Sequence, residues 1–246
     1  MTSVAPAYSV VLPIFNEQDN VGPLLDEIRG ALAPLGQPYE VLAVDDCSRD
    51  ASLTVLKAQQ ARHPELRIIR HRLNCGQSAA FASGLARARA PIVITLDSDR
   101  QNDPADLPRL IAALEPEVAA VLGVRRRRED STIRRLSSRI ANGYRDLLTG
   151  VPVRDAGCFL RVMRRDAIRE LPVFNGLHRF VATLLRYQGY RVVELDVNHR
   201  PRVAGPSNYG IGNRLWRGIR DCFAMRWYRA RAIPGDRTLP EEPRGG

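Results

Sequence analysis

Short apolar runs alternate with amphipathic stretches over the first half of the chain. Tyr8–Phe15 is rich in β-branched residues, which favour a strand, whereas Asn20–Leu32 carries apolar residues at helical spacing. Both patterns recur up to residue 124. The predicted strands are Tyr8–Phe15, Tyr39–Val44, Leu66–Arg70, Pro91–Leu96 and Ala119–Val124. The predicted helices are Asn20–Leu32, Ser52–Arg62, Ser78–Ala90 and Pro104–Leu114, with Ser48 or Asp50 as cap of the second and Asp103 as cap of the fourth.

Strands that alternate with helices predict an α/β fold, in which a mostly parallel sheet carries helices on both faces. The strands show little polar alternation, as expected for strands buried on both sides. The second half adds a predicted helix at Leu177–Tyr187, a strand at Arg191–Val197 and two basic amphipathic stretches, Ile133–Leu148 and Ile211–Tyr228. From Pro234 onward the chain is polar and rich in Pro and Gly, which predicts a disordered tail.

The charge of the chain narrows the range of its partners. Its 246 residues include 37 basic and 27 acidic side chains, for a net charge of +10, and Lys57 is the sole lysine. Such a chain favours anionic partners: nucleic acid, an anionic bilayer or phosphorylated ligands. The four cysteines lie far apart in sequence, which predicts reduced thiols. We expect neither a signal peptide nor a membrane span, because no apolar run reaches about 20 residues.

Polar clusters follow the first four predicted strands. They are Asn16-Glu17, Asp45-Asp46, Asn74-Cys75-Gly76 and Asp97-Ser98-Asp99. Ligands of parallel sheets bind at the carboxyl ends of the strands, so we expect the four clusters to converge on one edge. Asp97 and Asp99 suit Mg²⁺ or Mn²⁺, with Gln101 as a further oxygen ligand. The alternative is that these aspartates only cap the following helix.

Two of the other clusters have the chemistry of a nucleotide site. The adjacent carboxylates of Asp45 and Asp46 repel each other unless they find donors, which a ribose or a base N–H supplies; the alternative is a solvated turn. Gly76 allows close approach of a ligand, and the N–H groups of the helix that follows suit a phosphate or a sugar hydroxyl. The chain has no P-loop motif and no G-x-G-x-x-G after the first strand, which argues against those two classes.

Together these motifs resemble those of family-2 glycosyltransferases with the GT-A fold, over roughly residues 8–228. The nearest branch is the polyprenyl-phosphate sugar synthases, such as dolichyl-phosphate mannose synthase and bacterial undecaprenyl-phosphate glycosyltransferases. The matching segments are 13–17 (PIFNE), 44–50 (VDDCSRD), 74–77 (NCGQ), 96–104 (LDSDRQNDP), 153–161 (VRDAGCFLR), 178–180 (HRF) and 199–210 (HRPRVAGPSNYG). We expect a catalytic domain over 1–212, followed by a basic amphipathic helix and a disordered polar tail over 213–246.

The resemblance implies a role for each motif. The nucleotide-sugar would be bound by Pro13, Phe15, Glu17, Asp45, Asp46, Gly76, Gln77, Asp97 and Ser98. Asp99 and Gln101 would hold Mg²⁺ or Mn²⁺, and Asp99 and Asp155 would be the catalytic residues. Asp155 would lie near the acceptor phosphate or act as its base. The acceptor phosphate would be bound by Arg200, Arg202 and Ser207, since a guanidinium fork suits a phosphate.

The implied reaction is an inverting transfer of a sugar from a GDP- or UDP-sugar to undecaprenyl or dolichyl phosphate. A phosphate oxygen would displace the leaving group directly, and it is already anionic near neutral pH, so it needs no strong base. The chain departs from the branch at Asn208, where a lysine is usual, and we expect none of the C-terminal transmembrane helices that many members carry. The implied place of action is the cytoplasmic face of a membrane, where a separate membrane protein would be a further partner.

The role of the two basic amphipathic stretches stays open. Their apolar stripes would lie in the headgroup layer of a membrane, or would pack on the core of the protein. The function also has alternatives: transfer to a polysaccharide or soluble acceptor, nucleic-acid binding, and nucleotide-sugar binding without turnover. Aromatic residues make up only 6% of the chain, without a nucleic-acid-binding motif, so we expect no nucleic acid among the partners.

Overall fold

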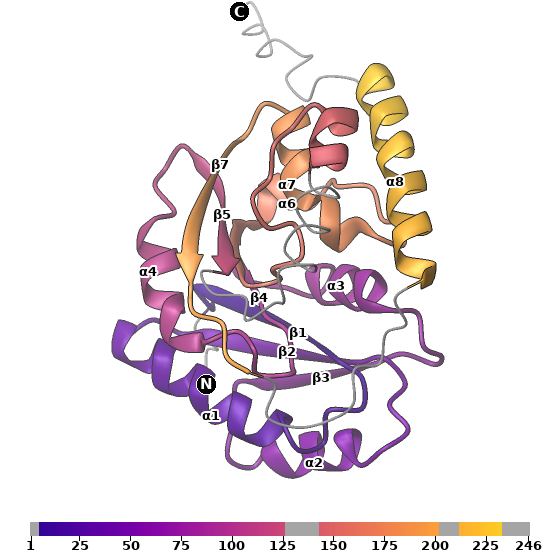
Figure 1. Ribbon diagram of the computed structural model, residues 1–246. Helices are drawn as coiled ribbons and strands as arrows, with labels where there is room; N and C mark the ends of the chain where they lie inside the picture. The colour runs from indigo at the N-terminus through magenta and orange to yellow at the C-terminus, as the bar shows by residue number, and fades with distance from the viewer. Residues whose placement is uncertain (1–4, 126–142, 202–211, 233–246) are drawn as a thin grey trace, which may run out of the picture.

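The computed structural model describes residues 5–125, 143–201 and 212–232. They form a seven-stranded sheet with helices packed against it. The strands are β1 (Tyr8–Ile14), β2 (Tyr39–Asp45), β3 (Leu66–Arg70), β4 (Ile92–Thr95), β5 (Val118–Arg125), β6 (Arg161–Arg164) and β7 (Arg191–Val197). Their order across the sheet is β3-β2-β1-β4-β6-β5-β7 (Figure 1). Neighbouring strands run parallel, except that β6 is antiparallel to both β4 and β5.

Helices cover both faces of the sheet. They are α1 (Val21–Leu32), α2 (Ser52–Gln59), α3 (Gln77–Leu85), α4 (Leu107–Ala112), α6 (Arg165–Ile168), α7 (Leu177–Tyr187) and α8 (Gly212–Arg231), with 3₁₀ turns η1 (Ala33–Leu35) and η2 (Pro104–Asp106) and a helical segment at 143–149. Successive residues of β1 point to opposite faces and join two separate cores. Leu12 packs in a core with Leu24 of α1. Val11 belongs to the other core, with Phe81 of α3, so the predicted α/β fold is confirmed.

Several elements differ from the predictions: α2 ends at Gln59 rather than Arg62, the predicted helix Pro104–Leu114 is η2 followed by the short α4, and α6 was not predicted. α3 ends at Leu85 rather than Ala90, because the Arg89 N–H donates to Glu40 Oε1 at 2.8 Å instead of to a helical carbonyl. β6 has no counterpart among the predicted strands, since an arginine stands at each end of its four residues. It forms through pairing with β4 and β5, which are distant from it in sequence and flank it in the sheet.

The predicted helix caps are correct in one case and wrong in the other. Ala51 is the N-cap of α2, in place of Ser48 or Asp50. The Asp50 carboxylate nevertheless accepts the N–H of the first helical residue at 2.9 Å. Asp103 does cap η2, since its Oδ1 accepts the Ala105 N–H at 3.0 Å.

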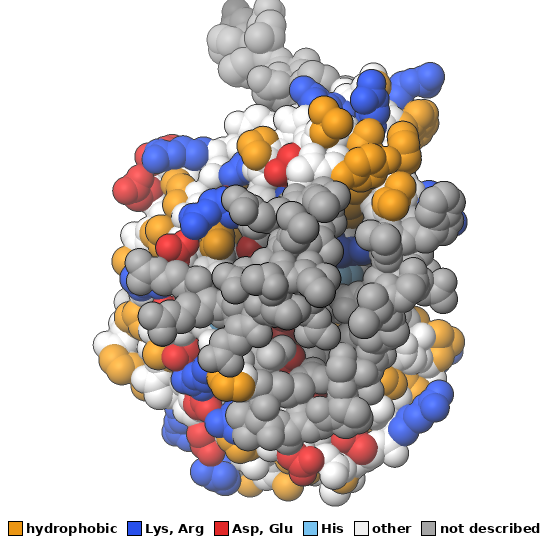
Figure 2. Space-filling model, in the orientation of Figure 1, with side chains coloured by type: hydrophobic (Ala, Val, Ile, Leu, Met, Phe, Trp, Pro, Cys, Tyr) orange, Lys and Arg blue, Asp and Glu red, His pale blue; other side chains and the backbone are white. Residues whose placement is uncertain are grey.

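The C-terminal part forms α7 and β7 with the predicted bounds, and α8 as a helix of 20 residues. Cys222 and Met225 of α8 belong to the core that α7 lines, whereas Phe223 and Trp227 are 53% and 63% exposed. Hydrophobic side chains therefore gather on the surface over α8 (Figure 2). Of the two alternatives left open for this apolar stripe, packing on the core does not hold at Phe223 and Trp227. Most of Ile133–Leu148 lies outside the described residues.

No described helix is both long enough and apolar enough to cross a membrane. The predicted division of the chain after residue 212 stays a prediction, because α8 shares a core with α7. The disordered tail predicted from Pro234 onward lies outside the described residues.

Candidate active site

Asp46 joins two of the predicted clusters at the end of β2. Its buried carboxylate accepts the N–H of Cys75 at 2.9 Å and the N–H of Gly76 at 2.7 Å. Oδ1 also lies 2.6 Å from Nδ1 of His71. Gly76 has a φ of 84°, which glycine adopts without strain, as the chain turns into α3. The predicted need of Asp46 for donors is therefore met within the protein.

Asp45 differs from its neighbour, because one of its carboxylate oxygens has no hydrogen-bond partner among the described residues. Oδ1 accepts the Ser48 N–H at 3.1 Å, whereas Oδ2 lies 3.7 Å from Nε of Arg70. The Asp45 side chain is fully buried, and that of Arg70 is largely exposed. A buried oxygen without a donor is unfavourable, so a ligand N–H or hydroxyl at Oδ2 would be stabilising.

The loop after β1 is held against the loop after β2. The Asn16 N–H donates to Ser48 Oγ at 3.1 Å, and the Glu17 N–H donates to Ser52 Oγ at 2.8 Å. A cavity of about 340 Å³ opens between the two loops and is lined in part by Glu17 and Arg49. We call these two loops, residues 15–20 and 46–51, together with residues 71–76 before α3, the donor-side loops. Asp46 and the serines thus bring three of the predicted clusters together.

The segment after β4 is tied to both β1 and α3. Ser98 is buried, and its Oγ donates to the carbonyl oxygen of Pro13 at 2.8 Å. Gln77 Nε2 donates to Asp97 Oδ1 at 2.7 Å. These two bonds complete the predicted convergence of four clusters on one edge of the sheet.

Asp99 and Gln101, the predicted metal ligands, lie in one turn, residues 99–101, which we call the metal turn after that prediction. Asp99 Oδ1 accepts the Gln101 N–H at 3.1 Å. Between them Arg100 has a φ of 59°, and Asn16 and Cys47, which also follow strand ends, have φ of 56° and 62°. Residues other than glycine seldom adopt such angles, and they concentrate at functional sites. Because Asp103 provides the helix cap, the alternative that Asp97-Ser98-Asp99 only caps the helix is not supported.

Two arginines that the motif analysis does not assign to the site lie beside Asp97. Arg125 ends β5 and Arg161 begins β6. Burial and the like charge of Asp99 raise the pKa of Asp97 to about 7, while the charges of Arg125 and Arg161 and the bond from Gln77 act in the opposite direction. Asp97 is therefore poised between its charged and neutral forms near neutral pH.

The same arginines hold the segment 155–158, which we call the Asp155 turn. Arg125 binds Asp155 through two parallel bonds, Nε to Oδ2 at 2.7 Å and Nη2 to Oδ1 at 2.8 Å. The Gly157 N–H adds a bond to Oδ1 at 3.2 Å. Arg161, only 4% exposed, donates to the Cys158 carbonyl oxygen at 3.0 Å. The predicted catalytic Asp155 is thus held by a half-buried guanidinium through charge-assisted hydrogen bonds.

Arg200 lies next to the predicted metal ligands. Its backbone N–H donates to the Gln101 carbonyl oxygen at 2.9 Å. Its guanidinium pairs with Glu27 at 2.7 Å and with Asp103 at 2.6 Å. The predicted acceptor loop therefore starts beside the metal turn, and two carboxylates neutralise the charge of Arg200. Its phosphate-binding role stays a prediction; Arg202, Ser207 and Asn208 lie outside the described residues.

The remaining predicted residues lie at the rim. Phe15 and Glu17 are half-buried at the end of β1. His178 at the start of α7 has Nδ1 2.7 Å from Ser78 Oγ in the first turn of α3. Arg179 does not face the site in this way, because it pairs with Asp221 of α8 at 2.8 Å. Of the matching segment 178–180, His178 therefore lies by the site, whereas Arg179 and Phe180 pack in the C-terminal part.

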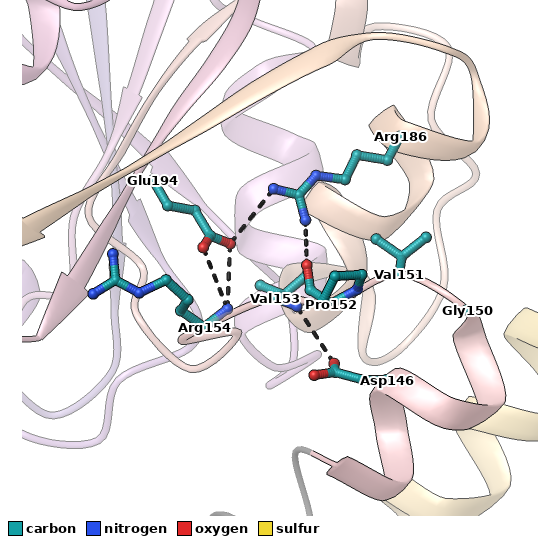
Figure 3. A pocket seen from close by; sticks show the side chains of 8 residues that line it. All are labelled: Asp146, Gly150, Val151, Pro152, Val153, Arg154, Arg186 and Glu194. Carbon is teal, nitrogen blue, oxygen red and sulfur yellow. Dashed lines mark hydrogen bonds and ion pairs between the residues drawn. The ribbon is translucent and has the colours of Figure 1, made fainter.

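A second cavity, of about 630 Å³, lies away from these clusters, between the helical segment 143–149, α7 and β7 (Figure 3). Its charged side chains mostly bind one another or the backbone. Glu194 lies 3.7 Å from Arg186 and accepts the Arg154 N–H at 3.3 Å, and Asp146 accepts the Val153 N–H at 3.4 Å. This arrangement suits a structural role better than ligand binding, because its charges are already paired.

Comparison with known proteins agrees with this geometry. Residues 9–172 match the family model described as glycosyl transferase family 2. A dodecaprenyl-phosphate galacturonate synthase from Rhizobium johnstonii is 35% identical over 233 residues, which cover 92% of this chain and 69% of that protein. An undecaprenyl-phosphate 4-deoxy-4-formamido-L-arabinose transferase from Edwardsiella ictaluri is 36% identical over 205 residues, or 82% of this chain and 63% of the relative. The chain thus spans about two thirds of the length of these relatives.

Solved structures resemble the whole fold at lower identity. A mannosyltransferase from Pyrobaculum calidifontis, in complex with GDP-Man and Mn²⁺, superposes with a TM-score of 0.65 at 21% identity, over 94% of this chain and 66% of that one. Glucosyl-3-phosphoglycerate synthase from Mycobacterium tuberculosis, with Mn²⁺, UDP and glucosyl-3-phosphoglycerate, gives 0.66 at 19% identity, over 94% and 82%. The strand-end clusters, the GT-A-like architecture and the family match lead to one assignment: this chain belongs to glycosyl transferase family 2.

Proposed function

We propose that this chain is an inverting glycosyltransferase that moves a sugar from a GDP- or UDP-sugar to undecaprenyl or dolichyl phosphate. Family membership supports the transferase class, and the relatives named above are a dodecaprenyl-phosphate and an undecaprenyl-phosphate enzyme. The observation that carries the proposal is the single sheet edge where the donor-side loops, the metal turn and the Asp155 turn meet.

The donor nucleotide binds at the ends of β1, β2 and β4. Of the adjacent residues Asp45 and Asp46, it is Asp45 that binds the nucleotide directly, because its Oδ2 is buried without a hydrogen-bond donor among the described residues. Asp46 acts through the loop that it holds at Gly76. Asp97, tied to Gln77 of α3, completes this side of the site. Pro13, Phe15, Glu17 and Ser98 shape the rest.

Asp99 and Gln101 hold Mg²⁺ or Mn²⁺ in this proposal. Their fit rests on the donor set, since a carboxylate and an amide carbonyl in one turn offer the hard oxygens that these ions prefer. Solved relatives of the fold contain Mn²⁺ with GDP-Man or with UDP. When bound, the ion neutralises the negative charge that develops on a diphosphate leaving group.

Asp155 faces the acceptor phosphate and does not act as a strong base. Its carboxylate accepts N–H groups from the side chain and the backbone of Arg125 and from the backbone of Gly157, which favours the charged form. The attacking phosphate oxygen is already anionic, so no proton has to be removed. Arg202 and Ser207 bind that phosphate, and Arg200 positions the start of their loop.

The acceptor is a membrane lipid, so a membrane-docking surface belongs to the proposal. Phe223, Trp227 and Leu147 are exposed, and we call them the α8 patch. The segment 143–149 abuts α8, since Arg229 Nη1 donates to the Thr149 carbonyl oxygen at 3.3 Å. Exposed apolar side chains surrounded by arginines suit the headgroup layer of an anionic bilayer (Figure 2). The protein then works peripherally, at the cytoplasmic face, and a separate membrane protein receives its product.

A transfer assay tests this function. The protein is incubated with a short-chain polyprenyl phosphate, Mn²⁺ or Mg²⁺ and a panel of GDP- and UDP-sugars, and the lipid-linked sugar is followed by mass. We expect product with one donor and none in the presence of a chelator. Equally fast transfer to soluble acceptors would refute polyprenyl phosphate as the acceptor. Nucleotide-sugar binding without any product would refute the proposed transferase activity.

A further inference from the structure

Asp46, His71 and Cys75 form a cluster whose chemistry the proposed transfer does not use. One carboxylate oxygen, one ring nitrogen and the thiol sulfur all lie within 4.8 Å of one another. They come from the end of β2, from the residue after β3 and from the loop before α3, so only the fold brings them together. Cys75 is exposed, while the side chains of Asp46 and His71 are 5% and 12% exposed. The cluster is therefore preformed and open to solvent on its sulfur side.

The donor set of this cluster differs from that of the metal turn. Asp99 and Gln101 offer oxygen alone, which suits Mg²⁺ and Mn²⁺. A thiolate, an imidazole and one carboxylate are the ligands that Zn²⁺ prefers, and three protein ligands leave its fourth tetrahedral position to water. The two sites would thus select different ions, even with Mg²⁺ in excess.

We propose that Asp46, His71 and Cys75 bind Zn²⁺ or a similar thiophilic divalent cation at a second metal site. His71 is oriented for this role, since its Nε2 lies 2.8 Å from Ser83 Oγ. A metal on Nδ1 requires the proton on Nε2, and Ser83 Oγ accepts that proton's hydrogen bond. The separation of Asp46 Oδ1 and His71 Nδ1 opens from 2.6 Å to the roughly 3.3 Å between two tetrahedral Zn²⁺ ligands.

Occupation of this site changes the donor-side loops, and this consequence rests on the proposed function. The thiol of Cys75 loses its proton to solvent as the metal binds. Asp46 Oδ1, which accepts the Cys75 N–H at 2.9 Å, turns toward the ion, and the bond that fixes the loop before α3 weakens. Asp45, the proposed direct ligand of the nucleotide, is adjacent in the chain. Zn²⁺ therefore lowers affinity for the nucleotide-sugar and inhibits transfer.

Co²⁺ titration of the full chain, with excess Mg²⁺ and no other added metal, tests the site independently of activity. A thiolate-to-cobalt charge-transfer band should appear, saturate at one equivalent and disappear on addition of Zn²⁺. The Cys75→Ser variant, which keeps the backbone N–H, should lose the band, and the matched control Cys47→Ser should retain it. His71→Gln and Ser83→Ala should weaken Co²⁺ affinity at least about tenfold.

Three results would overturn the second metal site: no band in the wild type, a band that survives in Cys75→Ser, or an unchanged affinity in His71→Gln, which would mean binding to a lone thiol. The regulatory consequence has its own test, in which nucleotide-sugar binding is titrated with and without Zn²⁺. Weaker binding in the wild type but not in Cys75→Ser supports it, and equal binding refutes it. Failure of the transfer reaction leaves the cobalt result intact, so the two proposals fail separately.

Discussion

The donor-side loops and the Asp155 turn meet at one sheet edge but are held by different interactions. In the donor-side loops, side-chain oxygens accept backbone N–H groups, as where Asp46 accepts the Gly76 N–H at 2.7 Å. The Asp155 turn is held by the side chains of Arg125 and Arg161, which reach it from β5 and β6. Changes at the donor and metal side should therefore affect catalysis first, while changes among the arginines should affect folding as well.

The largest effect is expected at the metal turn. Asp99→Ala removes a proposed metal ligand, and transfer should fall on the order of a thousandfold, or about 4 kcal/mol of transition-state stabilisation. The free energy of unfolding should change by less than about 0.5 kcal/mol, since the side chain is half-exposed. Initial rates and urea unfolding measure the two quantities. Glu170→Gln, an exposed carboxylate remote from the edge, is the control, and a rate within tenfold of wild type would contradict the role of Asp99.

Arg161→Met, unlike Asp99→Ala, should lower the stability of the protein as well as its activity. It removes a buried guanidinium beside Asp97 and leaves the Cys158 carbonyl oxygen without its donor, so unfolding should become easier by about 3 kcal/mol. The control is Arg191→Met on the edge strand β7, where a surface ion pair contributes little to stability. Equal losses in the two variants would show that Arg161 does not organise the Asp155 turn.

The donor-side loops and the Asp155 turn each contain a cysteine, Cys75 and Cys158, so their accessibility can be compared by the rate of chemical modification. Burial, and next the charge of Asp155, raise the pKa of the Cys158 thiol to about 11, so only about one molecule in a thousand carries the thiolate at pH 8. Cys75 is exposed in the donor-side loops. Iodoacetamide should label Cys75 at least about a hundredfold faster, as followed by peptide mass. The rate at Cys158 should rise toward that of Cys75 in urea; comparable rates in the native protein would indicate that the Asp155 turn opens.

The sequence predicts that the strand-end clusters meet at one edge of the sheet, because these motifs lie directly after strands that local patterns reveal. Asp97 and Asp99 follow a buried apolar run, and parallel topology then places them at the shared edge. Their interactions also stay local, as in the turn where Asp99 accepts the Gln101 N–H.

The position of the arginines that hold the Asp155 turn could not be predicted in the same way. β6 is a four-residue strand with an arginine at each end, so no alternating or apolar pattern identifies it. Arg161 resembles one more charge in a chain of net charge +10, and only the pairing of β6 with β4 and β5 reveals that it is buried. The different hydrogen bonds of Asp45 and Asp46 are equally hidden, because they depend on which carboxylate reaches the loop before α3.

The smallest effect is expected at the α8 patch, which belongs neither to the donor-side loops nor to the Asp155 turn. The double variant with Phe223→Ala and Trp227→Ala should bind vesicles of anionic phospholipid about tenfold more weakly, since two aromatic side chains no longer enter the headgroup layer. Its stability should stay close to that of the wild type, because both residues are more than half exposed. Vesicle co-sedimentation measures binding, with Tyr190→Ala, exposed beside β7, as the matched control. Unchanged vesicle binding would exclude this surface from membrane docking. A clear loss of stability would mean instead that the two aromatic side chains pack against the protein in solution.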